Sequence, residues 1–314
     1  MRSKPAAFFA AMKISLLAAL FGLSLPALAQ TQQLVVLGVA QDAGYPQIGA
    51  TQEFIATELG QRTRQKVVAL GVVDAQAGQK FLFEATPDLP AQLFALNEVL
   101  PTPGTLPTGI FLTHGHIGHY TGLMYLGREA SGASAVPVYA MPRMTSFLTT
   151  NAPWSQLVAL HNIELRPLAA GQAITLNPML KVRPFLVPHR DEFTETVGFE
   201  IMGQHKKAVF IPDIDKWSKW PTSLPEVIKQ ADYVLIDATF YRNGEIPRDM
   251  AEVPHPFVAE TTKLLQALPA TERAKVYFIH FNHTNPLLNP DSPERREVQR
   301  LGFHVATEGL ELPL

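Results

Sequence analysis

Short blocks of apolar and polar residues alternate along the chain from residue 30 onward. In the first half, apolar runs bounded by turn residues predict buried strands at 34–39, 66–73, 80–84, 109–113 and 136–140. Apolar residues at helical spacing predict helices at 90–100, 120–130 and 141–150. This half of the chain is therefore expected to begin with three strands in succession and then to alternate between helices and strands.

The second half repeats the mixture. Strands are predicted at 180–187, 196–202, 207–211, 233–237, 275–280 and 303–307, and helices at 224–231, 256–268 and 293–301. No linker or internal repeat interrupts the chain after residue 30, and the 26 prolines are spread along it. These patterns predict layered α/β packing in one domain at 30–314.

The first 29 residues have the composition of a secretory signal peptide. Three basic residues precede an apolar stretch at 14–25, and this stretch is followed by the Ala-x-Ala pattern of Ala27-Leu28-Ala29. The apolar stretch is short for a membrane span, although an uncleaved N-terminal anchor is the alternative. We therefore predict a signal peptide at 1–29, a periplasmic or secreted mature protein, and no stable membrane anchor after cleavage.

Composition narrows the possible partners and ligands. Of the 314 residues, 46% are apolar and 17% charged, which is typical of a globular protein. The formal net charge is −2, and cleavage removes three of 26 basic residues and none of 28 acidic ones, which leaves −5. Without a basic surplus, we expect a small-molecule substrate and no nucleic-acid partner. With no cysteine in the chain, any metal must be held by imidazole and carboxylate groups.

A histidine cluster follows the strand predicted at 109–113. His114, His116 and His119 lie within six residues. Side chains alternate on an extended strand end, so His114 and His116 point the same way, and a turn can bring His119 into a shared pocket. Neutral imidazole is a good ligand for zinc, iron and related ions. The alternative is a histidine-rich surface loop.

Three further predicted strands are each followed by a possible ligand. His189 comes after the strand at 180–187, Asp213 after the one at 207–211, and His280 ends the strand at 275–280. Taken singly, each is more typical of a structural histidine or a turn aspartate. Together with the cluster they predict a metal site held on rigid strand ends.

This spaced set resembles the metallo-β-lactamase superfamily, whose signature is His-x-His-x-Asp-His followed by a histidine, an aspartate and a final histidine. The corresponding positions here are His114, His116, Gly118, His119, His189, Asp213 and His280. The resemblance implies a four-layer αβ/βα metallo-β-lactamase sandwich. The stretches at 37–47, 85–88, 119–123 and 278–286 resemble the PqqB-like branch, which acts in pyrroloquinoline quinone biosynthesis. That branch works in the cytoplasm and has zinc-binding cysteines, whereas this chain has an export signal and no cysteine.

Gly118 stands where the family has an aspartate that binds a second metal and orients the water. Glycine can do neither, so the resemblance implies one tight zinc ion and a second that is weak or absent. The tight ion is expected on His114, His116 and His189, with Asp213 as a fourth or bridging ligand. The weak position is expected on His119, His280 and Asp213. His283 is a possible replacement ligand; its alternative role is that of a solvent-facing loop residue.

The expected activity is hydrolysis by a metal-bound hydroxide, acting on an ester, lactone, amide or phosphoester. Asp213 is a possible proton acceptor, as is Asp42 if its loop folds over the site, and His255 is a possible proton donor. The stretch 237–240 with His255 resembles a Glu-Ala-Thr and histidine pair that assists proton transfer in the ribonuclease Z branch. The alternative is that Asp237 caps a strand end and His255 caps a helix.

Two other functions fit the same residues. A histidine-rich site with one carboxylate also suits non-haem iron, as in a PqqB-like oxygenase. Gly118 is also compatible with a catalytically decayed periplasmic metal-binding protein. The sequence carries no signal for the substrate, because one fold hosts many functions.

Overall fold

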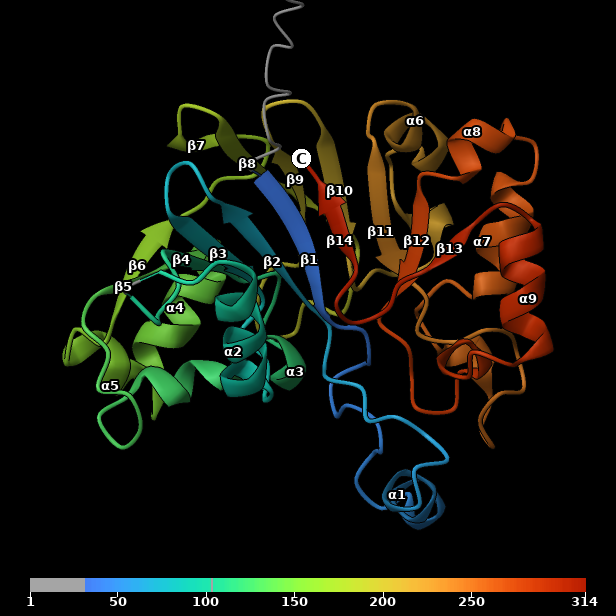
Figure 1. Ribbon diagram of the computed structural model, residues 1–314, viewed down its shortest axis with the longest axis horizontal. Coiled ribbons are helices and arrows are strands. Elements are labelled where there is room, and N and C mark those ends of the chain that lie inside the picture. The colour runs from blue at the N-terminus through green and yellow to red at the C-terminus, as the bar shows by residue number, and fades with distance from the viewer. Residues whose placement is uncertain (1–31, 103) are drawn as a thin grey trace, which may run out of the picture.

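Two seven-stranded sheets pack face to face in the computed structural model, which describes residues 32–102 and 104–314 (Figure 1). The predicted signal peptide at 1–29 lies outside these residues. The first sheet has the strand order β14-β1-β2-β3-β4-β5-β6. Its strands are β14 (Glu311–Pro313), β1 (Gln32–Gly38), β2 (Ala69–Asp74), β3 (Gln79–Phe83), β4 (Gly109–Phe111), β5 (Val136–Ala140) and β6 (Ile163–Pro167).

The second sheet is built in the same way from the later part of the chain. Its order is β13-β12-β11-β10-β9-β8-β7. The strands are β13 (His304–Val305), β12 (Val276–Ile279), β11 (Tyr233–Asp237), β10 (Lys207–Ile211), β9 (Val197–Met202), β8 (Leu180–Leu186) and β7 (Ile174–Asn177). Each sheet is antiparallel on one side and parallel on the other.

Helices cover the outer face of each sheet (Figure 1). The first half contributes α1 (Thr51–Glu58), α2 (Leu89–Val99), α3 (Ile117–Tyr120), the 3-10 helix η1 (Thr121–Leu126), α4 (Pro142–Thr150) and α5 (Trp154–Ala159). The second half contributes η2 (Trp217–Lys219), α6 (Leu224–Lys229), η3 (Met250–Glu252), α7 (Val258–Leu265), α8 (Ala270–Arg273), η4 (Pro286–Leu288) and α9 (Pro293–Arg300). This arrangement confirms the predicted four-layer αβ/βα sandwich.

The apolar run of β1 shows why both faces of a sheet are buried here. Leu34 and Val36 pack into the core between the two sheets, while Val35 and Leu37 pack against the helices of the first half. Successive side chains of a strand point to opposite faces, so a strand covered on both sides needs apolar residues throughout. Continuous apolar runs are the pattern from which these strands were predicted.

Every predicted strand is present, with ends shifted by a few residues, but the helix predicted at 120–130 is wrong. That segment forms α3 and the 3-10 helix η1, which ends at Leu126. Gly122 lies so close to another segment that a Cβ there would be 2.0 Å from the Thr86 carbonyl oxygen. Strands β6, β7 and β14 and helices α1, α5 and α8 were not predicted; the three strands are at sheet edges and lack continuous apolar runs.

The strands that precede the predicted ligands end at one edge of the sandwich. In the second sheet β10, β11 and β12 are parallel, and β8 runs the same way because both β8 and β10 are antiparallel to β9. In the first sheet β1 and β3 run the same way because both are antiparallel to β2, and β4 is parallel to β3. Ala40, just after β1, forms bridges to Val67 and to Phe281, which joins the two sheets at this edge.

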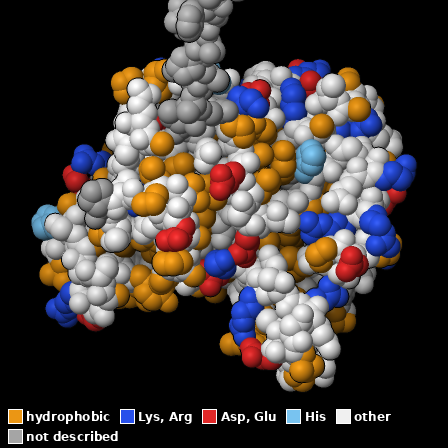
Figure 2. Space-filling model, in the orientation of Figure 1, with side chains coloured by type: hydrophobic (Ala, Val, Ile, Leu, Met, Phe, Trp, Pro, Cys, Tyr) orange, Lys and Arg blue, Asp and Glu red, His pale blue; other side chains and the backbone are white. Residues whose placement is uncertain are grey.

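One segment stands apart from the sandwich. Helix α1 projects away from it (Figures 1 and 2), and none of its side chains is buried. In the part of the chain that the structure describes, no helix combines the length and the apolar character needed to cross a membrane.

Candidate metal centre

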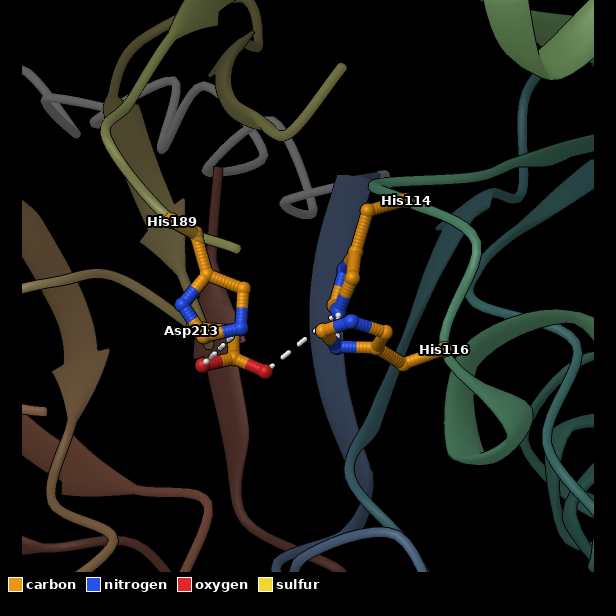
Figure 3. Close-up of side chains that lie close together, drawn as sticks. All are labelled: His114, His116, His189 and Asp213. Carbon is orange, nitrogen blue, oxygen red and sulfur yellow. Dashed lines mark hydrogen bonds and ion pairs between the residues drawn. The ribbon is translucent and has the colours of Figure 1, made fainter. Parts of the chain in front are cut away.

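His114 and His116 follow the first sheet, and they face His189 and Asp213, which follow strands of the second sheet (Figure 3). The Asp213 carboxylate lies between the two sides: Oδ2 is 3.4 Å from His114 Nε2, and Oδ1 is 3.3 Å from His189 Nε2. His116 Nδ1 is 2.8 Å from His114 Nε2. One ligand atom from each of the four lies within 4.8 Å of the others, so this group can hold a metal ion.

The remaining predicted ligands lie on the other side of Asp213. His119 Nε2 is 3.7 Å and His280 Nε2 is 3.9 Å from Asp213 Oδ2. Asp42 reaches the same place from the loop after β1, with Oδ1 at 3.4 Å from His119 Nε2. Asp42, His119 and His280 form a second group that can hold an ion. The structure thus brings all six predicted metal ligands and Asp42 into one cluster.

Buried partners orient the imidazoles of His114 and His119. The Thr113 hydroxyl donates its hydrogen to Glu84, so it accepts from Nδ1–H of His114, 2.9 Å away. His119 Nδ1 lies 3.1 Å from Glu84 Oε1 and donates to it. In both rings Nε2 then carries the lone pair, the arrangement found around metal-binding histidines; in His114 this atom faces His116 Nδ1, and in His119 it has no hydrogen-bond partner among the described residues.

Buried partners also surround the Nδ1 atoms of the two histidines that follow strands of the second sheet. The Thr239 hydroxyl donates to Asp237 Oδ1 at 2.7 Å and therefore accepts from Nδ1–H of His280 at 2.8 Å. His189 Nδ1 lies 3.4 Å from Asp215 Oδ1, an ion-pair contact without hydrogen-bond geometry, and its Nε2 lies 3.3 Å from Asp213 Oδ1. Glu84, Thr113, Thr239 and Asp215 were missed by the sequence reasoning. The sequence pattern could have identified Glu84 as a site residue, because it ends an apolar strand just as Asp213 follows one.

Several inward-facing atoms have no hydrogen-bond partner among the described residues. They are buried, and they are Asp42 Oδ1, His119 Nε2, His189 Nε2, Asp213 Oδ1 and His280 Nε2. A buried polar atom without a partner costs about 1–3 kcal/mol. Their grouping around one carboxylate fits a bound cation, which would satisfy all of them at once.

His255 and Asp237 form a buried ion pair next to the cluster. His255 Nδ1 is 2.8 Å from Asp237 Oδ2 and 3.2 Å from Asp213 Oδ1. Burial lowers the pKa of His255, but the Asp237 and Asp213 charges outweigh it and raise that pKa to about 9. Burial raises the pKa of Asp237, and the facing His255 lowers it to about 2. The alternative in which His255 caps a helix is wrong, because α7 starts at Val258 with Phe257 as its N-cap.

His283 does not join the cluster. Its Nδ1 lies 2.5 Å from Glu53 Oε1 on α1, and none of the candidate metal groups among the described residues includes it. The hypothesis that His283 compensates for Gly118 is therefore wrong. Its contact ties α1 to the loop after β12.

A cavity of about 580 Å³ opens beside His255. Its wall includes Arg190, Phe240, Arg248 and Asn282. Pockets for small molecules have volumes of about 300–1,000 Å³, so the cavity has the size of a substrate site.

Residues 79–281 match the family model of the β-lactamase superfamily domain, and this span contains every predicted metal ligand. The chain belongs to that superfamily. The matched span starts at β3, runs through both sheets and ends just after His280. The predicted resemblance to the superfamily is confirmed.

Relatives within this superfamily include the coenzyme PQQ synthesis protein B of several bacteria. The protein from Methylococcus capsulatus is 28% identical over 312 residues, covering 89% of this chain and 99% of the relative. The one from Gluconobacter oxydans is 28% identical over 308 residues, covering 90% and 98%. This near-complete overlap confirms the PqqB-like resemblance.

Solved structures give the same fold. Zn²⁺-bound PqqB from Methylobacterium extorquens superposes with a TM-score of 0.75 at 23% identity, covering 90% of this chain and all of that one. A diphosphatase from the PhnP family has a TM-score of 0.60 at 23% identity, covering 90% and 96%. A superfamily member with a related architecture therefore binds zinc.

Proposed function

We propose that the protein is an exported metal-dependent hydrolase that acts on an ester, lactone, amide or phosphoester bond. The observation that carries this proposal is the arrangement around Asp213. Its carboxylate is surrounded by imidazoles from both sheets, of which His119, His189 and His280 have inner nitrogens without hydrogen-bond partners, and His255 lies 3.2 Å from its Oδ1.

The first group is proposed to hold one zinc ion tightly, through His114, His116, His189 and Asp213. Three imidazoles and one carboxylate are typical ligands for catalytic zinc. When bound there, the ion would supply hydroxide near neutral pH and polarise the bond to be broken. Iron is the other metal that this ligand set accepts.

Asp213 and His255 would then have complementary roles. Burial raises the pKa of Asp213, but nearby His189, His255 and His280 hold it well below its ordinary value, so the carboxylate stays ionised. His255 keeps its proton at neutral pH and lines the cavity, where it can donate to a leaving group. Asp237 positions the ring by accepting from Nδ1.

Export is part of the proposal. The sequence pattern at 1–29 supports a signal peptide and a periplasmic or secreted mature protein. N-terminal sequencing of the protein from the periplasmic fraction should begin at Gln30. A start at residue 1 or recovery from the cytoplasm would contradict export without affecting the site.

Metal content and turnover test the hydrolase. The full-length gene is expressed without a histidine tag, and the purified protein is analysed by elemental mass spectrometry and assayed on ester, lactone, amide and phosphodiester substrates. We expect zinc, hydrolysis that a chelator abolishes, and loss of both in His116→Ala. His205→Ala, at an exposed histidine outside the site, should keep both. Metal binding without turnover on any substrate would instead favour the decayed binding protein.

A PqqB-like iron oxygenase is the second candidate. It is supported by the similarity of about nine-tenths of this chain to coenzyme PQQ synthesis proteins and by the nitrogen-rich first group. Iron in the purified protein, and substrate-dependent oxygen uptake in an oxygen-electrode assay, would favour this function over hydrolysis.

A further inference from the structure

Gly118 leaves a space that Asp42 fills. A Cβ atom added to Gly118 would lie 2.5 Å from Asp42 Cα and 2.5 Å from Asp42 Oδ1. Real Cβ atoms essentially never make contacts this short, so residue 118 cannot carry a side chain while Asp42 is in place. The aspartate missing from the histidine motif is thus replaced in space by an aspartate from another part of the chain.

The Asp42 carboxylate has one oxygen inside the cluster and one outside. Oδ1 is buried, has no hydrogen-bond partner among the described residues, and lies 3.4 Å from His119 Nε2. Oδ2 accepts a hydrogen bond from Gln41 at 3.3 Å. His119 Nε2 and His280 Nε2 are also buried and without a hydrogen-bond partner. Asp42, His119 and His280, which carry these three atoms, form one candidate metal group.

The loop that carries Asp42 is tied to the strand end that carries His280. Gln41 donates its backbone N–H to the Phe281 carbonyl at 2.8 Å and accepts from the Asn282 amide at 2.7 Å. Phe281 in turn donates to the Val39 carbonyl at 2.8 Å. The position of Asp42 is therefore set by backbone pairing and does not depend on a flexible side chain.

We infer that Asp42 has taken over the ligand role of the motif aspartate. It would bind a second divalent metal ion together with His119 and His280, with Asp213 shared between the two ions. Gly118 alone predicted that this position is weak or empty; the carboxylate supplied by Asp42 restores its negative charge. The inference rests on the proposed first site only through the shared Asp213.

Another group of four near Asp213 is a poorer candidate for the second ion. It combines Asp213 and His280 with Asp237 and His255. Both Asp237 oxygens already accept hydrogen bonds, Oδ1 from Thr239 and Oδ2 from His255. Neither Asp237 nor His255 has a buried side-chain atom without a partner. These two side chains therefore belong to a closed hydrogen-bond network, whereas the Asp42 group has open ligand atoms.

Zn²⁺ stoichiometry tests the inference. The tag-free protein is stripped with a chelator, and titrated with Zn²⁺ by calorimetry. We expect two ions for the wild type and one for Asp42→Asn, which keeps the size of the side chain but removes its charge. The second ion should weaken at least about 10–100-fold, the loss seen for an outer-shell partner alone. Asp191→Asn, at an exposed acid near His189, should still bind two.

A second variant separates a ligand role from simple packing. Gly118→Ala removes no ligand, but its methyl group displaces Asp42, so it should also lose the second ion while keeping the first. Circular dichroism and the retained first ion show that each variant is folded.

Three outcomes would overturn the inference. They are two ions in Asp42→Asn, an undisturbed second ion in Gly118→Ala, and a single ion in the wild type. In each of these outcomes at least one ion is still bound, so only the second site fails. If neither the wild type nor any variant binds an ion, the proposed first site fails as well.

Discussion

Glu84 Oε1 lies 3.1 Å from Nδ1 of His119, and both side chains are fully buried at the end of the first sheet. Glu84 also accepts from the Thr113 hydroxyl, which orients His114. One carboxylate therefore positions two of the proposed ligands, one for each metal position.

Glu84→Gln should weaken metal binding without removing a ligand. The amide accepts less strongly than a carboxylate from Nδ1–H of His119 and from the Thr113 hydroxyl, and loss of such a partner typically costs about 10–100-fold in metal affinity. Zinc titration of the stripped protein measures this. Glu129→Gln, at an exposed site, is the control; equal affinities in the two variants would contradict the positioning role of Glu84.

The pKa of His255, raised to about 9, predicts an alkaline limit to activity. The protonated ring is the donor, so hydrolysis should fall as pH rises through the pKa of His255. In the zinc-loaded enzyme this limit should lie between the ordinary histidine value and about 9, because a cation on Asp213 offsets part of the charge that raises the pKa. Asp237→Asn removes the main charge that raises this pKa and should move the limit to lower pH. The alkaline limits of the wild type and of Asp237→Asn are measured from the pH profile of kcat on a substrate with a poor leaving group.

His255→Gln should lower kcat by about 10²–10⁴-fold, the usual contribution of a general acid. A substrate whose leaving group needs no protonation should lose much less, and zinc content should stay at the wild-type level. Equal losses on the two substrates would contradict the donor role.

Removing the metal should destabilise the fold. Without a cation, the buried carboxylates and imidazoles of the cluster keep atoms without partners. A ligand that binds only the folded state stabilises it by about 2.7 kcal/mol at 100 times its Kd. We expect chelation to lower Tm and zinc to restore it in calorimetric scans. The His116→Ala variant, which lacks a tight site, should show a much smaller shift.

The effect of Arg248→Ala on activity should depend on the charge of the substrate. Two arginines, Arg190 and Arg248, and one acid, Glu252, line the cavity beside His255, so its wall carries more basic than acidic side chains although the chain is acidic overall. We expect kcat/KM to fall about tenfold, or about 1.4 kcal/mol, for a phosphodiester. A neutral ester should change little. The matched control is Arg300→Ala, on the exposed side of α9; a uniform loss on both substrates would contradict recognition of negative charge.

The Phe111→Ala variant should be less stable to unfolding than the wild type. Phe111 is fully buried just before the histidine cluster, stacked on Phe83 at 4.8 Å and on Tyr139 at 4.4 Å. Truncating a buried phenylalanine costs about 3–5 kcal/mol. Denaturant unfolding measures this, and Phe94→Ala, at a position that is 66% exposed on α2, should have almost no effect.

Local pattern was sufficient for most of the strands and for the ligand positions at their ends. Side-chain alternation and apolar runs are properties of neighbouring residues, so β1, β10 and β12 could be predicted from them. The edge strands β6, β7 and β14 could not, because a strand covered on one side or at an edge needs no continuous apolar run.

By itself, the sequence determined most of the candidate metal ligands, through the spacing of His114, His116 and His119 and the strand ends that carry Asp213 and the later histidines. Only the tertiary structure decided how these residues are divided between the two candidate metal positions. The sequence interpretation of Gly118 was that of a lost ligand, because the motif is local. The space beside a glycine, however, is filled by whatever packs there, and backbone pairing between the loop after β1 and the end of β12 brings Asp42 into it.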